Sequence, residues 1–234
     1  LYRQKFFNET QKDFVNNFTH EFKTPLAVIK IAADVLQQQS TLDKHEKLKN
    51  YAGIIRDQTS HLQSQVQRLL EIAYTDRSSL PLKKEKFDIN LLIAESINDL
   101  QPLIEQKHAV LNTNFAVEQL ELTADRSYLR LCLINLIENA IKYSTAPVID
   151  ISTKVDGTTL FIVIKDNGIG IATEHQKKIF ERFYRITDGE LHISKGFGLG
   201  LNFVKKVIDT HHGKIEVMSE VGKGSSFIIK LSLK

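Results

Sequence analysis

The stretch VIDISTKVDGTTLFIVIKDNGIG, residues 148–170, decides the fold class of this chain. Two runs rich in β-branched residues, Val148 to Val155 and Thr159 to Lys165, flank the pair Asp156-Gly157. An Asp-Gly pair between two such runs predicts a β-hairpin. We therefore expect two antiparallel strands, the second of which runs directly into a glycine-rich loop.

Strands and helices are mixed on both sides of this hairpin. The apolar spacing predicts helices over Ile89 to Gln106, Asp125 to Tyr143, Glu174 to Arg182 and Leu199 to His212, and strands over Ala109 to Phe115, Glu121 to Thr123, Lys214 to Ser219 and Ser226 to Leu233. This proportion of strand to helix favours a two-layer α/β sandwich over residues 81–234.

The first 80 residues follow a different pattern. Apolar residues recur every three or four positions from Val15 to Leu36 and again from Leu48 to Ile72, which predicts an antiparallel helical hairpin with its turn near Ser40 to Lys44. Two helices cannot bury such stripes alone, so we expect a homodimeric four-helix bundle. The segment Arg77 to Pro81 breaks the periodicity and marks a linker. The whole chain is thus expected to be α+β, with domains over residues 1–80 and 81–234.

Composition narrows the class of protein. The chain has 234 residues, 42% of them hydrophobic and 25% charged, as in an ordinary globular protein. A net charge of +3 without a basic run argues against a nucleic-acid partner, and the lone Cys132 excludes a disulfide framework. No apolar run approaches the roughly 18 residues that cross a bilayer, so the chain itself is expected to be soluble.

A polar stripe follows the helix before the hairpin. Asn135, Asn139 and Lys142 fall at positions i, i+4 and i+7. Amide oxygens suit Mg²⁺, which keeps water and substrate phosphates in its other positions, and a lysine can meet phosphate charge. The alternative is a solvated face of an amphipathic helix, which by itself is equally well supported.

Two glycine clusters stand where backbone could approach a ligand. Asp166-Asn-Gly168-Ile-Gly170 follows a strand, and Gly196-Phe-Gly198-Leu199-Gly200 precedes a helix, whose first N–H groups favour phosphate. The Asp166 carboxylate could accept from an exocyclic amine. Either cluster alone could be a tight turn, and neither fits a P-loop or a Rossmann pattern.

Between the clusters, Ile179 to Arg185 is followed by a polar segment from Ile186 to Lys195. Apolar anchors before a loose polar run resemble a hinged lid, with Arg182, Arg185 and Lys195 available to phosphate. The alternative is an ordinary surface loop.

The stretch Phe18-Thr-His20-Glu21-Phe-Lys-Thr24-Pro25-Leu26 marks the N-terminal helices. A neutral imidazole is a competent nucleophile, and a neighbouring carboxylate can select its tautomer. His20 and Thr24 share a helix face, and Pro25 should bend the helix beside the histidine. Taken singly, each feature fits a surface histidine and a simple kink; the combination favours chemistry.

Taken together, the segments resemble the H-box, N-box, G1-box, F-box and G2-box of sensor histidine kinases, in that family's order: His20 to Leu26, Asn135 to Ser144, Asp166 to Gly170, Phe180 to Arg185 and Gly196 to Gly200. The resemblance covers essentially the whole chain. It implies a dimerisation and histidine-phosphotransfer domain followed by a Bergerat-type ATP-binding domain, with ATP and Mg²⁺ as ligands and a response-regulator receiver domain as partner.

The same resemblance implies a role for each matched residue. His20 would take the γ-phosphoryl group, Glu21 would orient or deprotonate it, and Thr24 would position water for regulator dephosphorylation. Asn139, with Asn135 beside it, would hold Mg²⁺, and Asp166 would read the adenine amine. The remaining nucleotide contacts would come from Lys142, Tyr143, Gly168, Gly170, Ile171, Arg182, Arg185, Lys195, Gly196, Gly198, Leu199 and Gly200.

Two departures from the family pattern are visible, Lys23 in place of the commoner arginine and Phe197 between the first G2 glycines. The family usually carries a sensor or membrane segment upstream, so we expect this chain to be the cytoplasmic portion of a membrane-bound kinase. Two alternatives stay open: an ATPase of the same fold without phosphotransfer, and a degenerate kinase that acts as a scaffold or only as a phosphatase.

Overall fold

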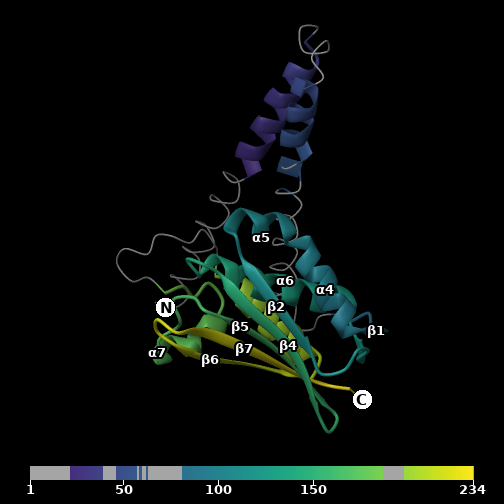
Figure 1. Ribbon diagram of the computed structural model, residues 1–234, viewed down its shortest axis with the longest axis vertical. Coiled ribbons are helices and arrows are strands. Elements are labelled where there is room, and N and C mark those ends of the chain that lie inside the picture. The colour runs from purple at the N-terminus through teal and green to yellow at the C-terminus, as the bar shows by residue number, and fades with distance from the viewer. Residues whose placement is uncertain are drawn as a thin grey trace, which may run out of the picture. The chain divides into compact units, whose positions relative to one another are not determined.

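The computed structural model describes residues 22–38, 46–56, 58, 59, 62, 81–186 and 198–233. The chain divides into two compact units, Leu1–Ala73 and Tyr74–Lys234 (Figure 1). The domain boundary expected near residue 80 falls within residues 63–80, outside the described part, and stays a prediction.

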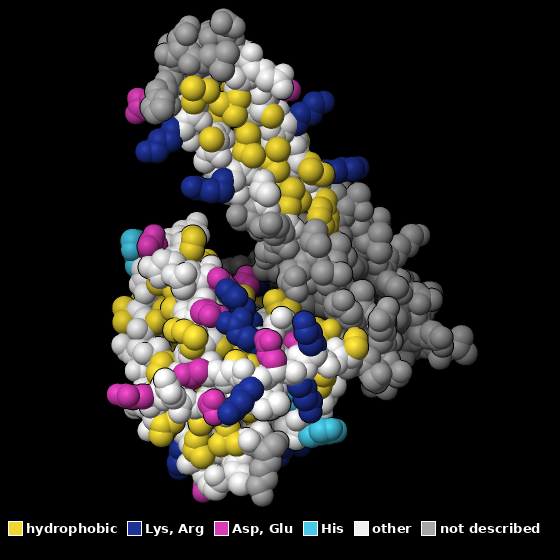
Figure 2. Space-filling view, turned by 90° about the vertical axis from the view of Figure 1, so that its right-hand side faces the viewer, with side chains coloured by type: hydrophobic (Ala, Val, Ile, Leu, Met, Phe, Trp, Pro, Cys, Tyr) yellow, Lys and Arg dark blue, Asp and Glu magenta, His cyan; other side chains and the backbone are white. Residues whose placement is uncertain are grey.

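The first unit is helical over residues 22–36 and 46–56, as the apolar spacing predicts. Hydrophobic side chains gather along the face of these helices that Figure 2 presents, and Leu26 and Ile31 are 54% and 62% exposed. The turn expected near Ser40 to Lys44 and the bend expected beside His20 lie outside the described residues. Within the described residues, no helix has the length and apolar character needed to span a bilayer.

The second unit is built on a five-stranded sheet in the order β2-β4-β5-β7-β6 (Figure 1). The predicted hairpin is its centre: β4 (Val148–Asp156) pairs antiparallel with β5 (Thr159–Asp166). β2 (Val110–Phe115) runs parallel to β4, and β7 (Gly224–Ser232) and β6 (Lys214–Glu220) extend the other edge antiparallel.

Helices cover one face of this sheet, as the two-layer prediction requires. α6 (Arg126–Lys142) contacts α4 (Ile89–Asp99), α8 (Gly200–Thr210), β4 and β5. Alternate strand residues such as Ile151, Ile162 and Ile164 are buried in one core with Leu133 and Ile137 of α6. Full burial of each such side chain stabilises the fold by about 1.5–3 kcal/mol. The sheet and the helices packed on it confirm the expected α+β architecture.

Three local predictions were wrong or incomplete. The helix predicted over Ile89 to Gln106 is two helices, α4 and α5 (Gln101–Lys107), because Pro102 cannot donate to the carbonyl four residues back. The pattern also missed β1 (Glu85–Asp88), a four-residue strand that pairs with β3 (Glu121–Ala124) in a separate two-stranded sheet. So short a strand has too few positions to show alternation.

The predicted helix over Glu174 to Arg182 is also broken, into α7 (Thr173–Gln176) and a 3₁₀ turn, Lys178–Phe180. The amide of Asn202 donates to the Phe180 carbonyl at 2.8 Å. That carbonyl would accept the next backbone N–H of a continuing helix, so the α8 side chain replaces the helical bond and the chain turns away.

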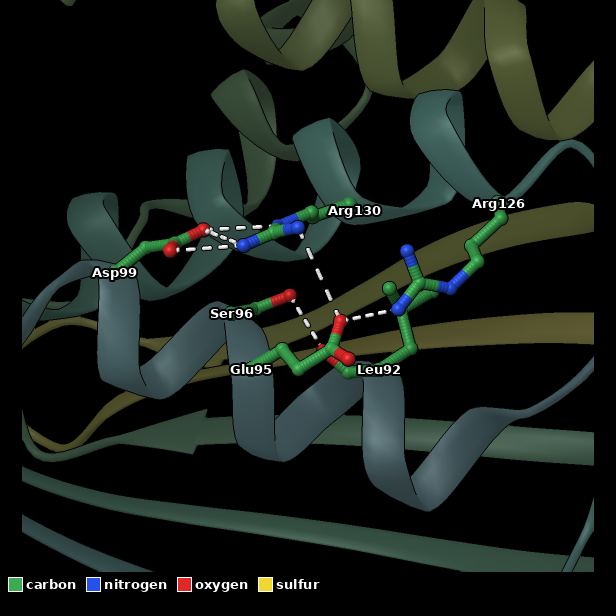
Figure 3. A network of polar contacts seen from close by, with 6 residues as sticks. All are labelled: Leu92, Glu95, Ser96, Asp99, Arg126 and Arg130. Atoms are coloured by element: carbon green, nitrogen blue, oxygen red, sulfur yellow. Dashed lines mark hydrogen bonds and ion pairs between the residues drawn. The ribbon is translucent and has the colours of Figure 1, made fainter.

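An ion-pair network joins α4 to α6 on the surface of the helical layer (Figure 3). Glu95 pairs with Arg126 and lies 3.9 Å from Arg130, which makes two hydrogen bonds of 2.9 and 2.8 Å to Asp99. A bidentate arginine–carboxylate pair fixes the orientation of both side chains. The network therefore adds a surface contact between α4 and the N-terminal half of α6, whose packing rests on the buried core.

Candidate nucleotide-binding site

The polar stripe of α6 is positioned by the burial of the opposite helix face. The Asp125 side chain caps the helix by accepting from the Tyr128 N–H at 3.0 Å. Leu129, Leu133, Leu136, Ile137 and Ile141 enter the core, which turns Asn135 and Asn139 away from it, where both remain half-buried. The Asn139 amide nitrogen donates to the Asn135 amide oxygen at 3.2 Å.

The donor set at this stripe fits Mg²⁺ better than a transition metal. The Asn139–Asn135 bond uses the nitrogen of Asn139, so the amide oxygen of Asn139 lies outside that bond. Among the described residues no group of three or more His, Cys, Asp or Glu is placed to hold a metal. Neutral amide oxygens without such a cluster suit an ion whose other ligands are nucleotide phosphates and water.

Gly200, the first residue of α8, lies against this stripe. A Cβ at position 200 would overlap the side-chain amide of Asn135. The helix has no side-chain N-cap bond, so its first N–H groups are not satisfied by a capping side chain. The glycine at the start of α8 therefore lets the helix N-terminus approach the amides that the sequence predicts as magnesium ligands.

Asp166 ends β5 on the helix-covered face of the sheet. Its side chain is 7% exposed, and one carboxylate oxygen accepts from the Gly168 N–H at 2.8 Å and the Ser225 N–H at 3.2 Å. Burial raises the pKa of this carboxyl, and the two backbone hydrogen bonds partly offset that rise. Asp166 is therefore a fixed hydrogen-bond acceptor held in a partly desolvated site.

The first glycine loop packs on the C-terminal end of α6. The Ile169 N–H donates to the Tyr143 carbonyl at 3.1 Å. A Cβ at Gly168 would lie 2.6 Å from the same carbonyl oxygen and 2.8 Å from Asp166 Oδ1. The loop therefore reaches Tyr143 only because position 168 lacks a side chain, and it brings Asp166 beside the end of the polar helix.

The β6–β7 turn supplies residues that the sequence analysis missed. Gly224 of this turn has φ of 90°, and a Cβ there would overlap the Asp166 carbonyl. That close approach presents the Ser225 N–H to the Asp166 carboxylate. The available signal was the string Gly222-Lys-Gly224-Ser225 before a strand, a third glycine cluster of the same kind as the other two.

The segments that flank residues 187–197 contact each other through Phe183 and Gly198. The Phe183 N–H donates to the Gly198 carbonyl at 2.9 Å, and both residues have positive φ, 63° and 68°. The Arg182 guanidinium lies over the Phe183 ring, 4.9 Å from its centroid. Arg182 is half-buried and Arg185 is exposed.

The structure therefore brings most of the predicted residues of the second unit into three neighbouring groups. Asn135, Asn139 and Gly200 form the first; Asp166, Gly168 and the end of α6 with Lys142 and Tyr143 form the second; Phe183 and Gly198 form the third. Lys195, Gly196, His20 and Glu21 lie outside the described residues. Thr24 is exposed on the helix of residues 22–36, in the first unit.

Comparisons with known proteins follow the same division. Residues 10–77 match the His Kinase A (phospho-acceptor) domain, and residues 124–234 match the histidine kinase-, DNA gyrase B- and HSP90-like ATPase. The sensor protein RprX of Bacteroides fragilis is 38% identical over 236 residues, which cover 100% of this chain and 46% of RprX. The chain spans about half the length of the curated relatives it matches.

Solved structures agree. The catalytic domain of the histidine kinase ThkA is 28% identical with a TM-score of 0.58, over 64% of this chain and 96% of that one. ThkA in complex with the response regulator protein TrrA is 25% identical with a TM-score of 0.60, over 100% of this chain and 67% of that one.

Proposed function

The chain belongs to the sensor histidine kinase family, and on that premise we propose that it transfers the γ-phosphoryl group of ATP to His20 and then to an aspartate of a response-regulator receiver domain. The placement of the Asn135–Asn139 pair against the Gly200 helix start, and of the Asp166 carboxylate beside the end of α6, supports this most directly. These groups offer an amine acceptor, amide oxygens for a cation and backbone N–H groups for phosphate within one unit.

The proposed roles of Asp166, Asn139 and Asn135 follow from their geometry. Asp166 accepts a hydrogen bond from the exocyclic amine of adenine. Two backbone N–H groups hold its carboxylate in place for this contact. Asn139 and Asn135 hold Mg²⁺, which when bound neutralises phosphate charge. Further contacts to the nucleotide come from Lys142, Tyr143, Gly168, Gly170, Ile171, Arg182, Arg185, Lys195, Gly196, Gly198, Leu199 and Gly200.

The transfer step needs positioning more than covalent assistance from the ATPase unit. A neutral nitrogen of His20 attacks the γ-phosphorus, an N–P bond forms, and the bond from that phosphorus to the bridging oxygen breaks to release ADP. Glu21 orients the imidazole or accepts its proton. The phosphoryl group then passes from His20 to a carboxylate oxygen of the receiver aspartate, which restores the imidazole.

Partner contacts are proposed from the first unit. The histidine kinase ThkA has been solved with a response regulator, and the match to a phospho-acceptor domain favours dimerisation through the helical hairpin. The exposed Leu26 and Ile31 offer apolar surface for a second copy or a regulator. The relatives are named sensor proteins, and a membrane segment upstream of this chain stays a prediction.

A second activity, dephosphorylation of the regulator, is supported by Thr24. This residue follows His20 by four positions, and its side chain is exposed on the helix of residues 22–36. A hydroxyl on an exposed residue at this position can hydrogen-bond a water placed against a phosphorylated aspartate. Thr24→Ala should then slow loss of label from a phosphorylated regulator while leaving labelling of His20 unchanged.

The decisive experiment is incubation with Mg²⁺ and γ-labelled ATP. The proposal expects label that is labile to acid and stable to alkali, absent in His20→Gln and strongly reduced in Asn139→Ala. Label on His20→Gln equal to wild type would refute phosphotransfer to this residue. ATP hydrolysis without label would identify an ATPase of the same fold, and ATP binding with neither would identify a scaffold or a phosphatase.

A further inference from the structure

The side-chain hydroxyl of Ser219, on β6, is the centre of a hydrogen-bond network that includes Ser225, a residue that contacts Asp166. The Ile171 N–H donates to Ser219 Oγ at 2.8 Å, and Ser219 Oγ donates to the Gly224 carbonyl at 2.8 Å. Ser225 Oγ lies 2.9 Å from Ser219 Oγ, where it can donate to the remaining lone pair. The hydroxyl therefore joins the end of the first glycine loop to Gly224 and Ser225 of β7, the second of which contacts Asp166.

Gln176 of α7 hydrogen-bonds two members of the same network, Ile171 and Ser219. Its amide nitrogen donates to the Ile171 carbonyl at 3.0 Å and to the Ser219 carbonyl at 2.8 Å. The backbone of Ile171 is thus held through its N–H by Ser219 and through its carbonyl by Gln176. Both side chains are half-buried, which strengthens hydrogen bonds relative to solvent-exposed ones.

The network ends on the carboxylate that is proposed to read the base. Gly224 and Ser225 are held by Ser219, and the Ser225 N–H is one of the two backbone donors to Asp166. Neither Ser219 nor Gln176 bonds Asp166 itself. Their effect on the carboxylate is therefore indirect, through the placement of the β6–β7 turn and the exit of the glycine loop.

From this arrangement we infer that Ser219 and Gln176 are positioning residues for purine discrimination. The inference rests on the proposed function, since it takes Asp166 as the acceptor for the base. Adenine presents an amine donor at its six-position, whereas guanine presents a carbonyl oxygen that a carboxylate repels. A carboxylate held in one orientation therefore favours ATP over GTP, and one that can turn away discriminates less.

The test compares ATP and GTP affinities of the full chain by competition against a fluorescent ATP analogue. In Ser219→Ala, Ile171, Gly224 and Ser225 lose a shared partner, so the Kd for ATP should rise roughly tenfold while that for GTP stays near the wild-type value. Ser219→Thr keeps the hydroxyl and should retain the preference for ATP. Ser226→Ala is the matched control, because Ser226 directly follows Ser225 on β7 and takes no part in the network.

Gln176→Ala provides a second, independent variant if Ser219→Ala does not fold. An unchanged ATP-to-GTP preference in folded Ser219→Ala and Gln176→Ala would overturn the inference, as would an equal loss of affinity for both nucleotides, because that outcome indicates a purely structural role. The competition experiment measures nucleotide binding and does not depend on phosphorylation of His20. Wild-type protein that binds ATP without labelling His20 would contradict the proposed function and leave the inference testable.

Discussion

The backbone N–H of Asp125 donates to Nε2 of His211 at 2.9 Å, which joins the N-cap of α6 to the C-terminal end of α8. Nδ1 of the same ring lies 2.8 Å from the Val207 carbonyl. Both bonds form only when the proton is on Nδ1, so the fold selects one tautomer of a neutral imidazole. These are the two helices that carry Asn135, Asn139 and Gly200.

This contact predicts a loss of stability in mild acid. Burial lowers the pKa of His211 below its usual 6.5, outweighing the Val207 carbonyl and Asp125, which raise it; Lys84 and His212 lower it further. The unfolded chain therefore takes up a proton at higher pH than the folded one. The free energy of unfolding should fall as pH drops below about 6.5, until the folded-state pKa is reached.

The measurement is scanning calorimetry of wild type and His211→Gln between about pH 7.5 and 5.5, the range in which histidine titrates. The variant should lose less stability over this range, and taking the difference removes contributions that both proteins share. His212→Asn is the control, because His212 is exposed with φ of 57°, which asparagine tolerates. Parallel pH profiles for wild type and His211→Gln would rule out this assignment.

Asp166→Asn should stabilise the unliganded protein and weaken ATP binding. Because burial raises the pKa of Asp166 above 3.8, its ionised form is disfavoured by folding at neutral pH. An asparagine oxygen can still accept from the Gly168 and Ser225 N–H groups, without the charge. Loss of a charged acceptor for the base should weaken ATP binding roughly 10- to 100-fold.

Thermal unfolding and ATP titration of the same Asp166→Asn sample test both parts. A lower melting temperature would mean that the two backbone bonds to the charged carboxylate outweigh the cost of burying it. Unchanged ATP affinity would remove Asp166 from the nucleotide site.

Gly200→Ala should impair Mg²⁺-ATP binding more than folding. The added Cβ meets the end of the Asn135 side chain, which can rotate away, and that rotation breaks its bond with Asn139. Loss of one such bond corresponds to a roughly 2- to 10-fold rise in the Kd for Mg²⁺-ATP.

Gly53→Ala is the contrasting glycine change, because a Cβ at position 53 meets nothing within 4 Å and the residue lies inside a helix. It should stabilise the first unit by about 0.5–1 kcal/mol and leave nucleotide binding unchanged. Equal Mg²⁺-ATP affinities for Gly200→Ala and wild type would show that α8 does not need this close approach.

Arg130→Gln should lower stability by less than about 1 kcal/mol, since its side chain and that of Asp99 are roughly one-third exposed and water screens the pair. A double-mutant cycle with Asp99→Asn, read by thermal unfolding, isolates the pair. ATP affinity should not change, because the network lies on the N-terminal half of α6; a large change would show that α4 controls the site.

Much of the fold was predictable because burial is periodic. The β4–β5 hairpin followed from Asp156-Gly157 between two β-branched runs, and the buried face of α6 followed from its apolar spacing. The break at Leu100 depended on one proline whose local effect competed with a continuous apolar pattern. β1 could not be predicted, because a four-residue strand is stabilised by its partner β3 rather than by its own pattern.

By itself, the sequence determined which chemical groups are present and in what order, since spacing along a helix or strand places Asn135 and Asn139 on one face and Asp166 at a strand end. Only the tertiary structure decided that Gly224 and Ser225, nearly sixty positions after Asp166, complete its environment. Hydrogen bonds and close backbone approaches between distant segments depend on how strands pair and helices pack, and no local pattern encodes them. The hydrogen bonds of Ser219, Gln176 and His211 were likewise decided only by the tertiary structure.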